Sequence, residues 1–473
     1  MAKKEAIVLY PAPWVSHQTS MVELGNLLLT LRPSLSIHIL IATLPSQPPF
    51  SAATSSAAAA ITFHSLPTVN LPPSATHQEQ GALLFNVLRL NVPNFRHALL
   101  NISENYTLDA VIVDFFCISS SLKVVADFEL PGYCFYTCAA GSLASLLYLP
   151  TLHNKFTQSF EDYLDLLIDI PGVPPIPSSD MPSAILKRNE IYEIFLDIST
   201  RLPHSAGIII NTFEFMEPKA IQAIANGLCV LNSPTPPIYC IGPFVANAAG
   251  GGGGGDGGTE CLKWLDSQPS KSVVFLCFGS AGLFSVEQLR EIAVGLERSG
   301  HRFLWVVRNP PLENQSSGIN EKIDPDLNSL LPRGFLERTK ERGYVVKSWS
   351  PQAAVLNHDS IGGFVTHCGW NSVLESVCAG VPMLAWPLYA EQRYNRVLMV
   401  EEMKIALPML ESETGLVCSN EVEKRVKQLM ESNEGDLVRE QIVAMKNAAK
   451  VAVSDGGSSR IAVAELFESW KQK

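Results

Sequence analysis

Short apolar segments alternate with helical patterns in both halves of the 473-residue chain. Segments typical of buried strands in the first half are 6–10, 36–43, 110–116 and 132–137, and helical patterns such as 21–31 follow several of them. In the second half the same alternation runs through 272–280, 302–308, 344–349, 361–367 and 381–387. Alternating strands and helices are typical of a doubly wound parallel sheet. The sequence therefore predicts an α/β protein with two Rossmann-like domains.

A glycine-rich segment separates the two halves. A run of glycines has no side chains to pack and a large chain entropy, which favours a linker, and this run lacks the lysine of a phosphate-binding P-loop. We predict an N-terminal domain over 1–245, a linker over 246–259 and a C-terminal domain over 260–455. A final helix over 456–473 is expected to pack back on the N-terminal domain.

Charge and composition limit the classes of partner. The net charge of −11 argues against nucleic acid or an anionic membrane surface as the main partner. The most apolar long segment, 132–150, is interrupted by Thr, Ser and Gly, so it predicts a strand and a buried helix and no membrane insertion. The ten cysteines form no CxxC pair, and the apolar run near the N-terminus is too short for a signal peptide. We therefore expect a cytoplasmic protein.

One turn in the second half carries groups suited to phosphate. The apolar segment 361–367 ends at His367, and a helical pattern follows from Ser372. Asn371 and Ser372 occupy the positions where helix N-cap residues are expected. A helix start offers unpaired backbone N–H groups and a partial positive charge, which suit a phosphate. The turn by itself fits equally an ordinary capped helix.

The segment 349–392, which begins Trp-Ser-Pro-Gln and ends Ala-Glu-Gln, resembles the donor-binding signature of plant family-1 UDP-sugar glycosyltransferases. The segments FGS at 278–280, NTFEFME at 211–217 and GPF at 242–244 also occur where that family has such residues. The resemblance covers essentially the whole chain. It implies a GT-B fold, in which an acceptor-binding N-terminal domain and a UDP-sugar-binding C-terminal domain face each other across a cleft.

The same resemblance assigns the donor site. The residues that would contact the nucleoside are Trp349, Ser350, Gln352 and Glu375. The residues that would surround the diphosphate are Ser280, His367, Asn371 and Ser372. The residues expected at the sugar are Trp370, Glu391 and Gln392, with Thr137 adding a contact from the N-terminal domain. An indole can stack on the flat uracil, and a carboxylate can accept two hydrogen bonds from the ribose diol.

Catalysis is assigned in the same way to His17 and Asp114. His17 follows the first predicted strand and matches the family's general base, which removes a proton from the acceptor. Imidazole suits this role because its pKa lies near the working pH. Asp114 closes another strand and would hold the imidazole in one tautomer. Direct displacement on an α-linked UDP-sugar would give a β-glycoside with inversion.

The family usually has glycines where this chain has Trp14 and Ser16. A tryptophan there is expected at the mouth of the acceptor pocket, whose other residues are expected within 80–95, 139–150 and 185–200. The start of the chain resembles the branch that acts on flavonoids, chalcones and related phenols, although a triterpenoid acceptor is also compatible. Gln392, whose amide could bridge two adjacent sugar hydroxyls, predicts UDP-glucose as the donor co-substrate over UDP-galactose and UDP-glucuronic acid.

No metal or other cofactor is expected. The chain holds one Asp-x-Asp triplet, at Asp324 and Asp326, but it lies in the polar segment 310–332, which is typical of a surface loop. The partners expected are the donor and the acceptor, and a monomer is expected although the sequence does not determine the oligomeric state.

Three other functions are possible for a chain of this fold class. An NAD-linked oxidoreductase should show G-x-G-x-x-G between a strand and a helix, and neither YPAPWVSH nor FGSAGLFS has that spacing. A glycosyltransferase that forms a carbon–carbon glycoside would have the same motifs. A catalytically silent UDP-sugar-binding protein is disfavoured by His17 and Asp114, whereas Trp14 and Ser16 leave it open.

Overall fold

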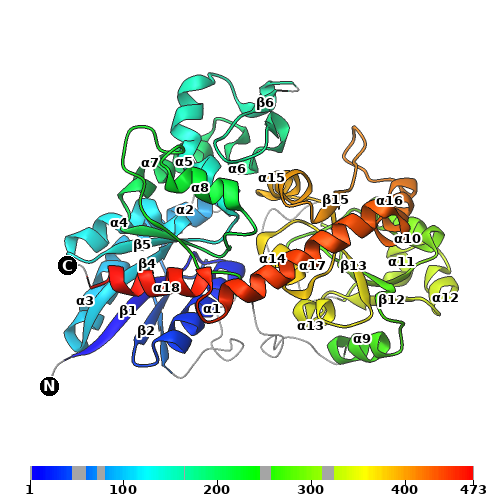
Figure 1. The fold of residues 1–473 in the computed structure, drawn as a ribbon, viewed down its shortest axis with the longest axis horizontal. Coiled ribbons are helices and arrows are strands. Elements are labelled where there is room, and N and C mark those ends of the chain that lie inside the picture. Colours follow the sequence, from blue (N-terminus) through cyan, green and yellow to red (C-terminus); the bar gives the residue numbers. More distant parts are fainter. Residues whose placement is uncertain are drawn as a thin grey trace. The chain divides into compact units, whose positions relative to one another are not determined.

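The computed structural model describes residues 3–44, 60–71, 80–164, 166–245, 257–311 and 324–471. The chain divides into two compact units (Figure 1). One unit comprises Met1–Ala246 together with Val451–Lys473, and the other comprises Asn247–Lys450. Residues 246–256 of the predicted linker lie outside the described residues. Its last three residues, 257–259, begin helix α9 (Gly257–Asp266).

The first unit is built on a seven-stranded sheet in the order β3-β2-β1-β4-β5-β8-β9, and every neighbouring pair is parallel. The strands are β1 (Lys4–Tyr10), β2 (Ser36–Ile41), β3 (Ile61–Ser65), β4 (Tyr106–Asp114), β5 (Gly132–Tyr136), β8 (Gly207–Ile210) and β9 (Ile238–Cys240). The helices used below are α1 (Val15–Leu31), α2 (Gln80–Leu90), α3 (Val92–Asn105), α4 (Ile118–Asp127), α5 (Ala140–Lys155) and α7 (Glu190–Arg201). Four of these strands match the predicted segments, whereas β3, β8 and β9 were not predicted.

The second unit contains a six-stranded parallel sheet in the order β12-β11-β10-β13-β14-β15. Its strands are β10 (Val273–Cys277), β11 (Arg302–Val307), β12 (Gly343–Lys347), β13 (Ile361–Thr366), β14 (Met383–Ala385) and β15 (Ala406–Pro408). Its helices include α10 (Val286–Ser299), α11 (Leu327–Leu330), α13 (Gln352–Leu356), α14 (Trp370–Ala379), α15 (Gln392–Val397), α16 (Ser419–Glu431) and α17 (Asn433–Val453). The predicted fold class, an α/β protein with two Rossmann-like domains, is confirmed.

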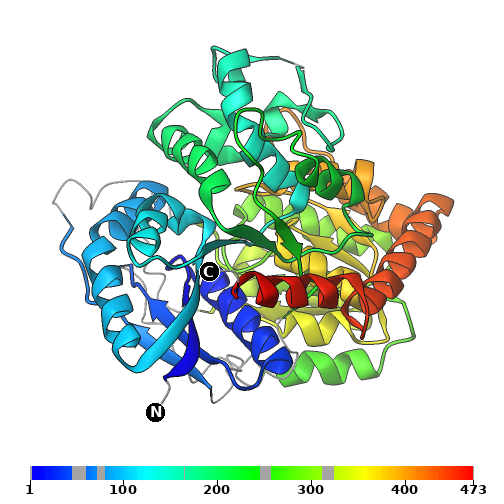
Figure 2. The ribbon, with the colours of Figure 1, turned by 60° about the vertical axis from the view of Figure 1, so that its left-hand side comes forward.

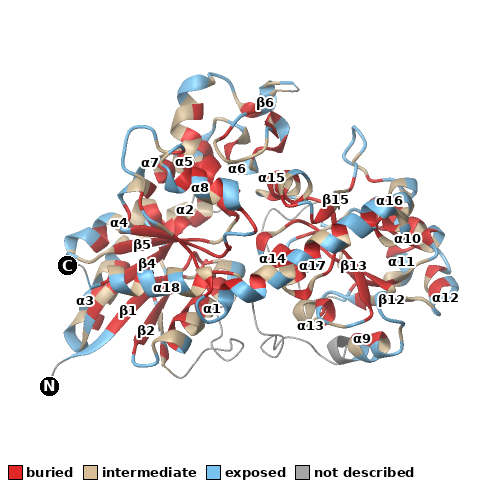
Figure 3. Ribbon diagram, viewed as in Figure 1, coloured by how far each residue is buried: buried red, intermediate tan, exposed pale blue. Residues whose placement is uncertain are grey.

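Continuous apolar runs explain why the central strands form. Every residue of β2, β5 and β13 is buried, as are the last five residues of β1. A parallel sheet buries its strands on both faces, because crossover helices cover both sides. Figure 3 shows the result as mostly buried strands in each unit, with exposed residues on the helices.

The last helix, α18 (Ser458–Ser469), packs within the first unit against β9 (Figures 1 and 2). The hydroxyls of Tyr133 and Ser469 lie 2.7 Å apart, and Ser459 donates a hydrogen bond to the carbonyl of Gly242. Val463, Leu466 and Trp470 belong to the same hydrophobic core as β1 and β2. The apolar segment 132–150 forms β5 and most of α5, and no described helix is both long and apolar enough to cross a membrane.

Candidate active site

His17 and Asp114 form a hydrogen-bonded pair in the first unit. His17 Nδ1 lies 2.7 Å from Asp114 Oδ2, and the other carboxylate oxygen accepts a hydrogen bond of 3.0 Å from the backbone N–H of Phe116. Asp114 ends β4 and is fully buried, whereas the His17 side chain is 13% exposed. His17 lies in the first turn of α1. An ionised carboxylate only accepts hydrogen bonds, so Nδ1 carries the proton and Nε2 is the basic nitrogen.

Aromatic rings surround this histidine. The rings of Trp14 and Phe116 lie 5.6 and 5.2 Å from that of His17, and they contact each other edge to face at 5.1 Å. Phe85 on α2 and Phe195 on α7 extend the cluster through Phe116, at 5.7 and 6.0 Å. Phe85 and Phe195 fall in two of the segments expected to line the acceptor pocket. Phe116 was not predicted, because its position depends on how β4 ends.

Trp14 has no backbone strain. Its φ of −105° and ψ of 139° are ordinary extended values, which any residue adopts. Ser16 lies within the first turn of α1. The two substitutions therefore change the side chains beside His17 but do not require an unusual chain path.

The turn after β13 differs in one respect from the prediction. Helix α14 begins at Trp370, and its N-cap is Gly369, so Asn371 and Ser372 lie inside the first turn and are not caps. Glycine has no side chain to accept a hydrogen bond, and no side-chain cap is present. The first N–H groups of the helix are therefore not satisfied by a side-chain cap, which is the arrangement that suits an anion.

His367 is held between two glycines. A Cβ atom on Gly279 would lie 2.7 Å from His367 Nε2, and one on Gly369 would lie 2.4 Å from the same atom. Burial lowers the pKa of His367 to about 4, so the ring is neutral at pH 7. Its Nδ1 is buried and has no hydrogen-bond partner among the described residues. A neutral imidazole can donate one hydrogen bond to a phosphate but brings no positive charge.

The predicted nucleoside contacts lie together at α13 and α14. Gln352 Nε2 donates to Glu375 Oε2 at 2.7 Å and to Ser372 Oγ at 2.8 Å. Burial raises the pKa of Glu375, and the bond from Gln352 partly offsets that effect. Trp349 is 39% exposed and so is not a core tryptophan. Ser350 is buried, and its hydroxyl has no partner among the described residues.

At the predicted sugar contacts, Gln392 differs from the expectation. Its amide oxygen accepts from the backbone N–H groups of Leu388 and Tyr389, each at 2.9 Å. The oxygen is therefore committed to the turn before α15, and the same side chain has a hydrogen bond with that of Tyr389. Asn395, which was not predicted, donates to the carbonyl of Cys368 at 2.9 Å and to Glu391 at 3.4 Å. Trp370 is buried.

Thr137 follows β5 in the first unit and is half-buried. Helix α5 starts three residues later, and both carboxylate oxygens of Glu217 accept from its first N–H groups, those of Ala140 and Gly141, at 2.9 Å. Thr212 donates to the same carboxylate at 2.6 Å. Burial raises the pKa of Glu217, and these three bonds oppose it. The segment NTFEFME thus fixes the start of α5 beside Thr137.

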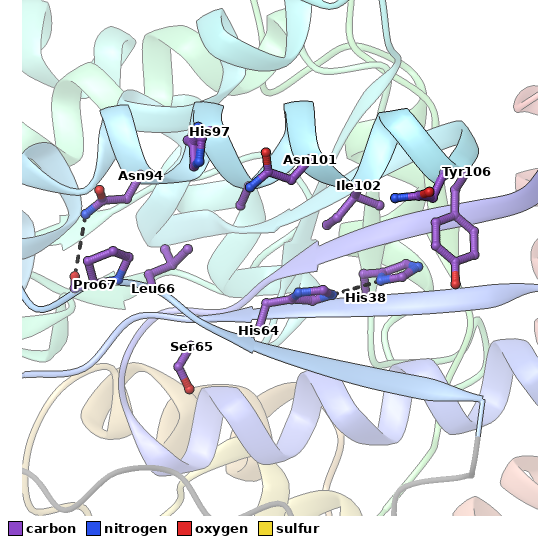
Figure 4. Close-up of a pocket in the computed structure, with 12 residues that line it drawn as sticks. His38, His64, Ser65, Leu66, Pro67, Asn94, His97, Asn101, Ile102 and Tyr106 are labelled. Carbon is purple, nitrogen blue, oxygen red and sulfur yellow. Dashed lines mark hydrogen bonds between the residues drawn. The ribbon is translucent and has the colours of Figure 1, made fainter.

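A pocket of about 280 Å³ lies elsewhere, between α3 and strands β2 and β3 (Figure 4). His38 Nδ1 and His64 Nε2 lie 2.9 Å apart there, and the lining includes Asn94, His97 and Asn101. None of the site residues predicted by number lines this pocket, although Asn94 belongs to the segment 80–95 that was expected at the acceptor pocket.

The Asp-x-Asp triplet has a local structural explanation. Asp326 caps α11 by accepting from the N–H of Asn328 at 3.1 Å. Residues 312–323 of the predicted polar loop lie outside the described residues. In the part of the chain that is described, no group of three or more His, Cys, Asp or Glu side chains could hold a metal ion.

Two parallel α/β units and a helix start suited to an anion are compatible with an enzyme that uses a nucleotide sugar. Residues 254–446 match the family model described as UDP-glucoronosyl and UDP-glucosyl transferase. An anthocyanidin 5,3-O-glucosyltransferase of a Rosa hybrid cultivar is 48% identical over 485 residues, which cover 99% of each chain. A phloretin 2'-O-glucosyltransferase of Malus domestica is 45% identical over 96% of this chain and 97% of its own. The chain therefore belongs to this family of UDP-sugar glycosyltransferases.

The fold is shared with a solved relative. The structure of Phytolacca americana UGT2 complexed with UDP-2fluoro-glucose and pterostilbene aligns with a TM-score of 0.87 and 35% identity, over 99% of this chain and all of the other. Both chains thus have the GT-B fold.

Proposed function

We propose that this enzyme transfers glucose from UDP-glucose to a hydroxyl of a flavonoid-like phenol and forms a β-glucoside. The observation that carries the proposal is the His17–Asp114 pair, at 2.7 Å, beside the aromatic cluster of Trp14 and Phe116. A base within a group of aromatic rings suits a flat, aromatic hydroxyl compound.

The proposed reaction is a single displacement. The acceptor hydroxyl gives its proton to His17 Nε2 while its oxygen attacks the anomeric carbon of glucose. The bond between that carbon and the β-phosphate oxygen breaks, and UDP leaves with the electron pair. Attack from the opposite face inverts the anomeric centre. The buried Asp114 carboxylate stabilises the imidazolium that forms, because it already accepts from Nδ1.

On the donor side, we infer that Trp349 stacks on uracil and that Glu375 binds the ribose. The α14 turn would bind the diphosphate with the first-turn N–H groups, His367, Asn371 and Ser372. Gln392 Nε2 would donate to a sugar hydroxyl, with Trp370 and Glu391 beside it. The proposed steps use these groups alone and include no metal ion.

The relatives support the acceptor class. Their names specify an anthocyanidin and phloretin as acceptors, and the Phytolacca structure contains pterostilbene beside a UDP-sugar analogue. All three are hydroxylated aromatic compounds.

The test is a product screen with a panel of phenols, in which UDP-glucose, UDP-galactose and UDP-glucuronic acid are compared as donors. Mass spectrometry identifies a hexoside, and NMR gives the linkage and the anomeric configuration. A β-O-glucoside formed fastest from UDP-glucose supports the proposal. An α-linkage, a carbon–carbon linkage, faster use of UDP-galactose or UDP binding without any product would each contradict it.

A further inference from the structure

Arg308 lies at the end of β11, beside the turn that follows the neighbouring strand β10. Its Nη1 donates to the carbonyl of Ser280 and to that of Gly279, the latter at 3.4 Å. Gly279 has a φ of +72°, and a Cβ added to it would lie 2.7 Å from His367 Nε2. One guanidinium therefore holds the Gly279–Ser280 turn in place against His367.

The charge of Arg308 is not balanced by an acid. The side chain is half-buried, and no Asp or Glu of the described residues lies within ion-pair distance of it. Burial lowers the pKa of Arg308, and Cys277 and Tyr389 oppose that effect. A guanidinium keeps its proton nonetheless, and a partly buried charge without a counter-charge is unfavourable. Such a charge suits a site that receives an anion.

The predicted diphosphate contacts lack this charge. Ser280, Asn371 and Ser372 are neutral, and the low pKa of His367 keeps it neutral as well. The Tyr389 ring lies 6.1 Å from that of His367 and is also within electrostatic range of Arg308. The positive group thus belongs to the same small region as the neutral donors, at the carboxyl ends of adjacent strands β10 and β11.

We propose that Arg308 is a positioning residue for the donor diphosphate, which fixes the Gly279–Ser280 turn and supplies the positive charge that this region otherwise lacks. The inference rests on the donor site of the proposed function and adds an electrostatic contribution to it. It predicts an effect that depends on phosphate, which a merely structural contact would not produce.

The experiment is calorimetric binding of UDP and of uridine to the full chain and to three variants. Arg308→Gln removes the charge but keeps hydrogen-bond donors, and Arg308→Lys keeps the charge but loses the planar fork. Arg302→Gln is the matched control: Arg302 begins the same strand, contacts Gln268 at 3.0 Å, and lies about 20 Å away along β11, at roughly 3.3 Å per residue.

Arg308→Gln is expected to weaken UDP binding about tenfold to a hundredfold, the usual effect of losing a charged contact, and to change uridine binding by less than about twofold. Arg308→Lys should lie between it and the wild type, and Arg302→Gln should match the wild type. UDP affinity should also fall less with added salt in Arg308→Gln.

Equal losses for UDP and uridine in Arg308→Gln would overturn the proposal, as would an unchanged affinity for UDP. If Arg308→Gln does not fold, the test uses Arg308→Lys alone. Equal losses of affinity for UDP and for uridine in that variant would overturn the proposal. A wild-type protein that binds uridine as tightly as UDP would instead show that the proposed diphosphate site is wrong, and the inference would fall with it.

Discussion

Two histidines, one in each unit, follow parallel strands but lie in opposite environments. His17 is partly exposed and shares a hydrogen bond with a buried carboxylate. His367 is buried, its Nδ1 has no partner among the described residues, and burial keeps its pKa at about 4. The neighbours therefore decide what an imidazole does: beside a carboxylate it can accept a proton, whereas a buried imidazole without an acidic partner stays neutral and can donate one hydrogen bond.

The largest expected effect is the loss of catalytic rate in His17→Ala. His17→Ala should lower kcat/KM for a phenol about a hundredfold to ten-thousandfold, because it removes the general base, while the Kd for UDP stays near the wild-type value. Steady-state rates and calorimetry check this. A more acidic phenol should regain part of the rate, since it needs less help to lose its proton. A near-wild-type rate would remove His17 from the mechanism.

A somewhat smaller loss is expected for Asp114→Asn, about tenfold to a thousandfold in kcat. The amide can donate to Nδ1, which moves the proton of the imidazole to Nε2, the nitrogen that must be basic. Asp127→Asn is the control, because Asp127 pairs with Arg96 at an exposed position on α4. Equal rates for the Asp114 and Asp127 variants would contradict the assigned role.

The surroundings of His367 are tested by Gly279→Ala. The new Cβ would meet the imidazole at 2.7 Å, so UDP affinity should fall about tenfold, as for a lost hydrogen bond in the site. Gly300→Ala is a matched control, since Gly300 has a similar φ of +77° but nothing within 4 Å of an added Cβ. Both variants should lose stability because of the positive φ, Gly279→Ala more because of the contact with His367, and only Gly279→Ala should bind UDP more weakly.

The dependence of stability on pH tests whether His367 is held neutral by burial. Burial lowers the pKa of His367, and of His38 near the α3 pocket, to about 4, whereas an unfolded histidine titrates near 6.5. The folded state binds fewer protons between these values, so stability is complete above pH 6.5 and is lost as the pH falls toward 4. At pH 5 each of these histidines should lower the free energy of unfolding by about 2 kcal/mol relative to neutral pH.

Urea unfolding at pH 7.5 and pH 5 measures this loss. His367→Asn should reduce the difference between the two pH values. A difference that His367→Asn does not reduce would mean that His367 is not held neutral in the folded protein.

The smallest effect concerns Trp14, which is half-buried and lies beside His17. Trp14→Gly should change kcat/KM for different phenols by unequal factors of about threefold to tenfold, the size expected when one aromatic contact is lost. The Kd for UDP should not change. One common factor for every acceptor would mean that Trp14 does not contact them.

Local sequence patterns predicted the parts of the molecule that depend on neighbouring residues. The continuous apolar runs of β1 and β13 identify buried parallel strands, and Asp114 was placed correctly at the end of β4. The three-residue strand β9 is too short for such a pattern. The N-cap of α14 was wrongly assigned because Asn371 is a better cap by residue type than Gly369, yet the turn geometry selects the glycine.

Contacts between distant segments could not be predicted from such patterns. Glu217 binds the start of α5 across 76 and 77 residues, and Arg308 reaches the Gly279–Ser280 turn across 28 and 29. Likewise, the amide oxygen of Gln392 was free to bind a sugar in the sequence-based prediction, whereas the folded turn uses it for two backbone N–H groups. Residue types identified the chemistry available, and only the fold determined which atoms remain to perform it.

The position of α18 has a consequence for biosynthesis. The core of the first unit takes Val463, Leu466 and Trp470 from the end of the chain, while Ala246 marks the end of its first segment. A ribosome must therefore translate about 200 further residues before that core can be completed. At elongation rates of about 5 to 20 residues per second this takes roughly 10 to 40 s. During this interval Tyr239 and Ile241, which belong to the same core, lack part of their cover, and the nascent chain offers chaperones an apolar surface that the finished enzyme conceals.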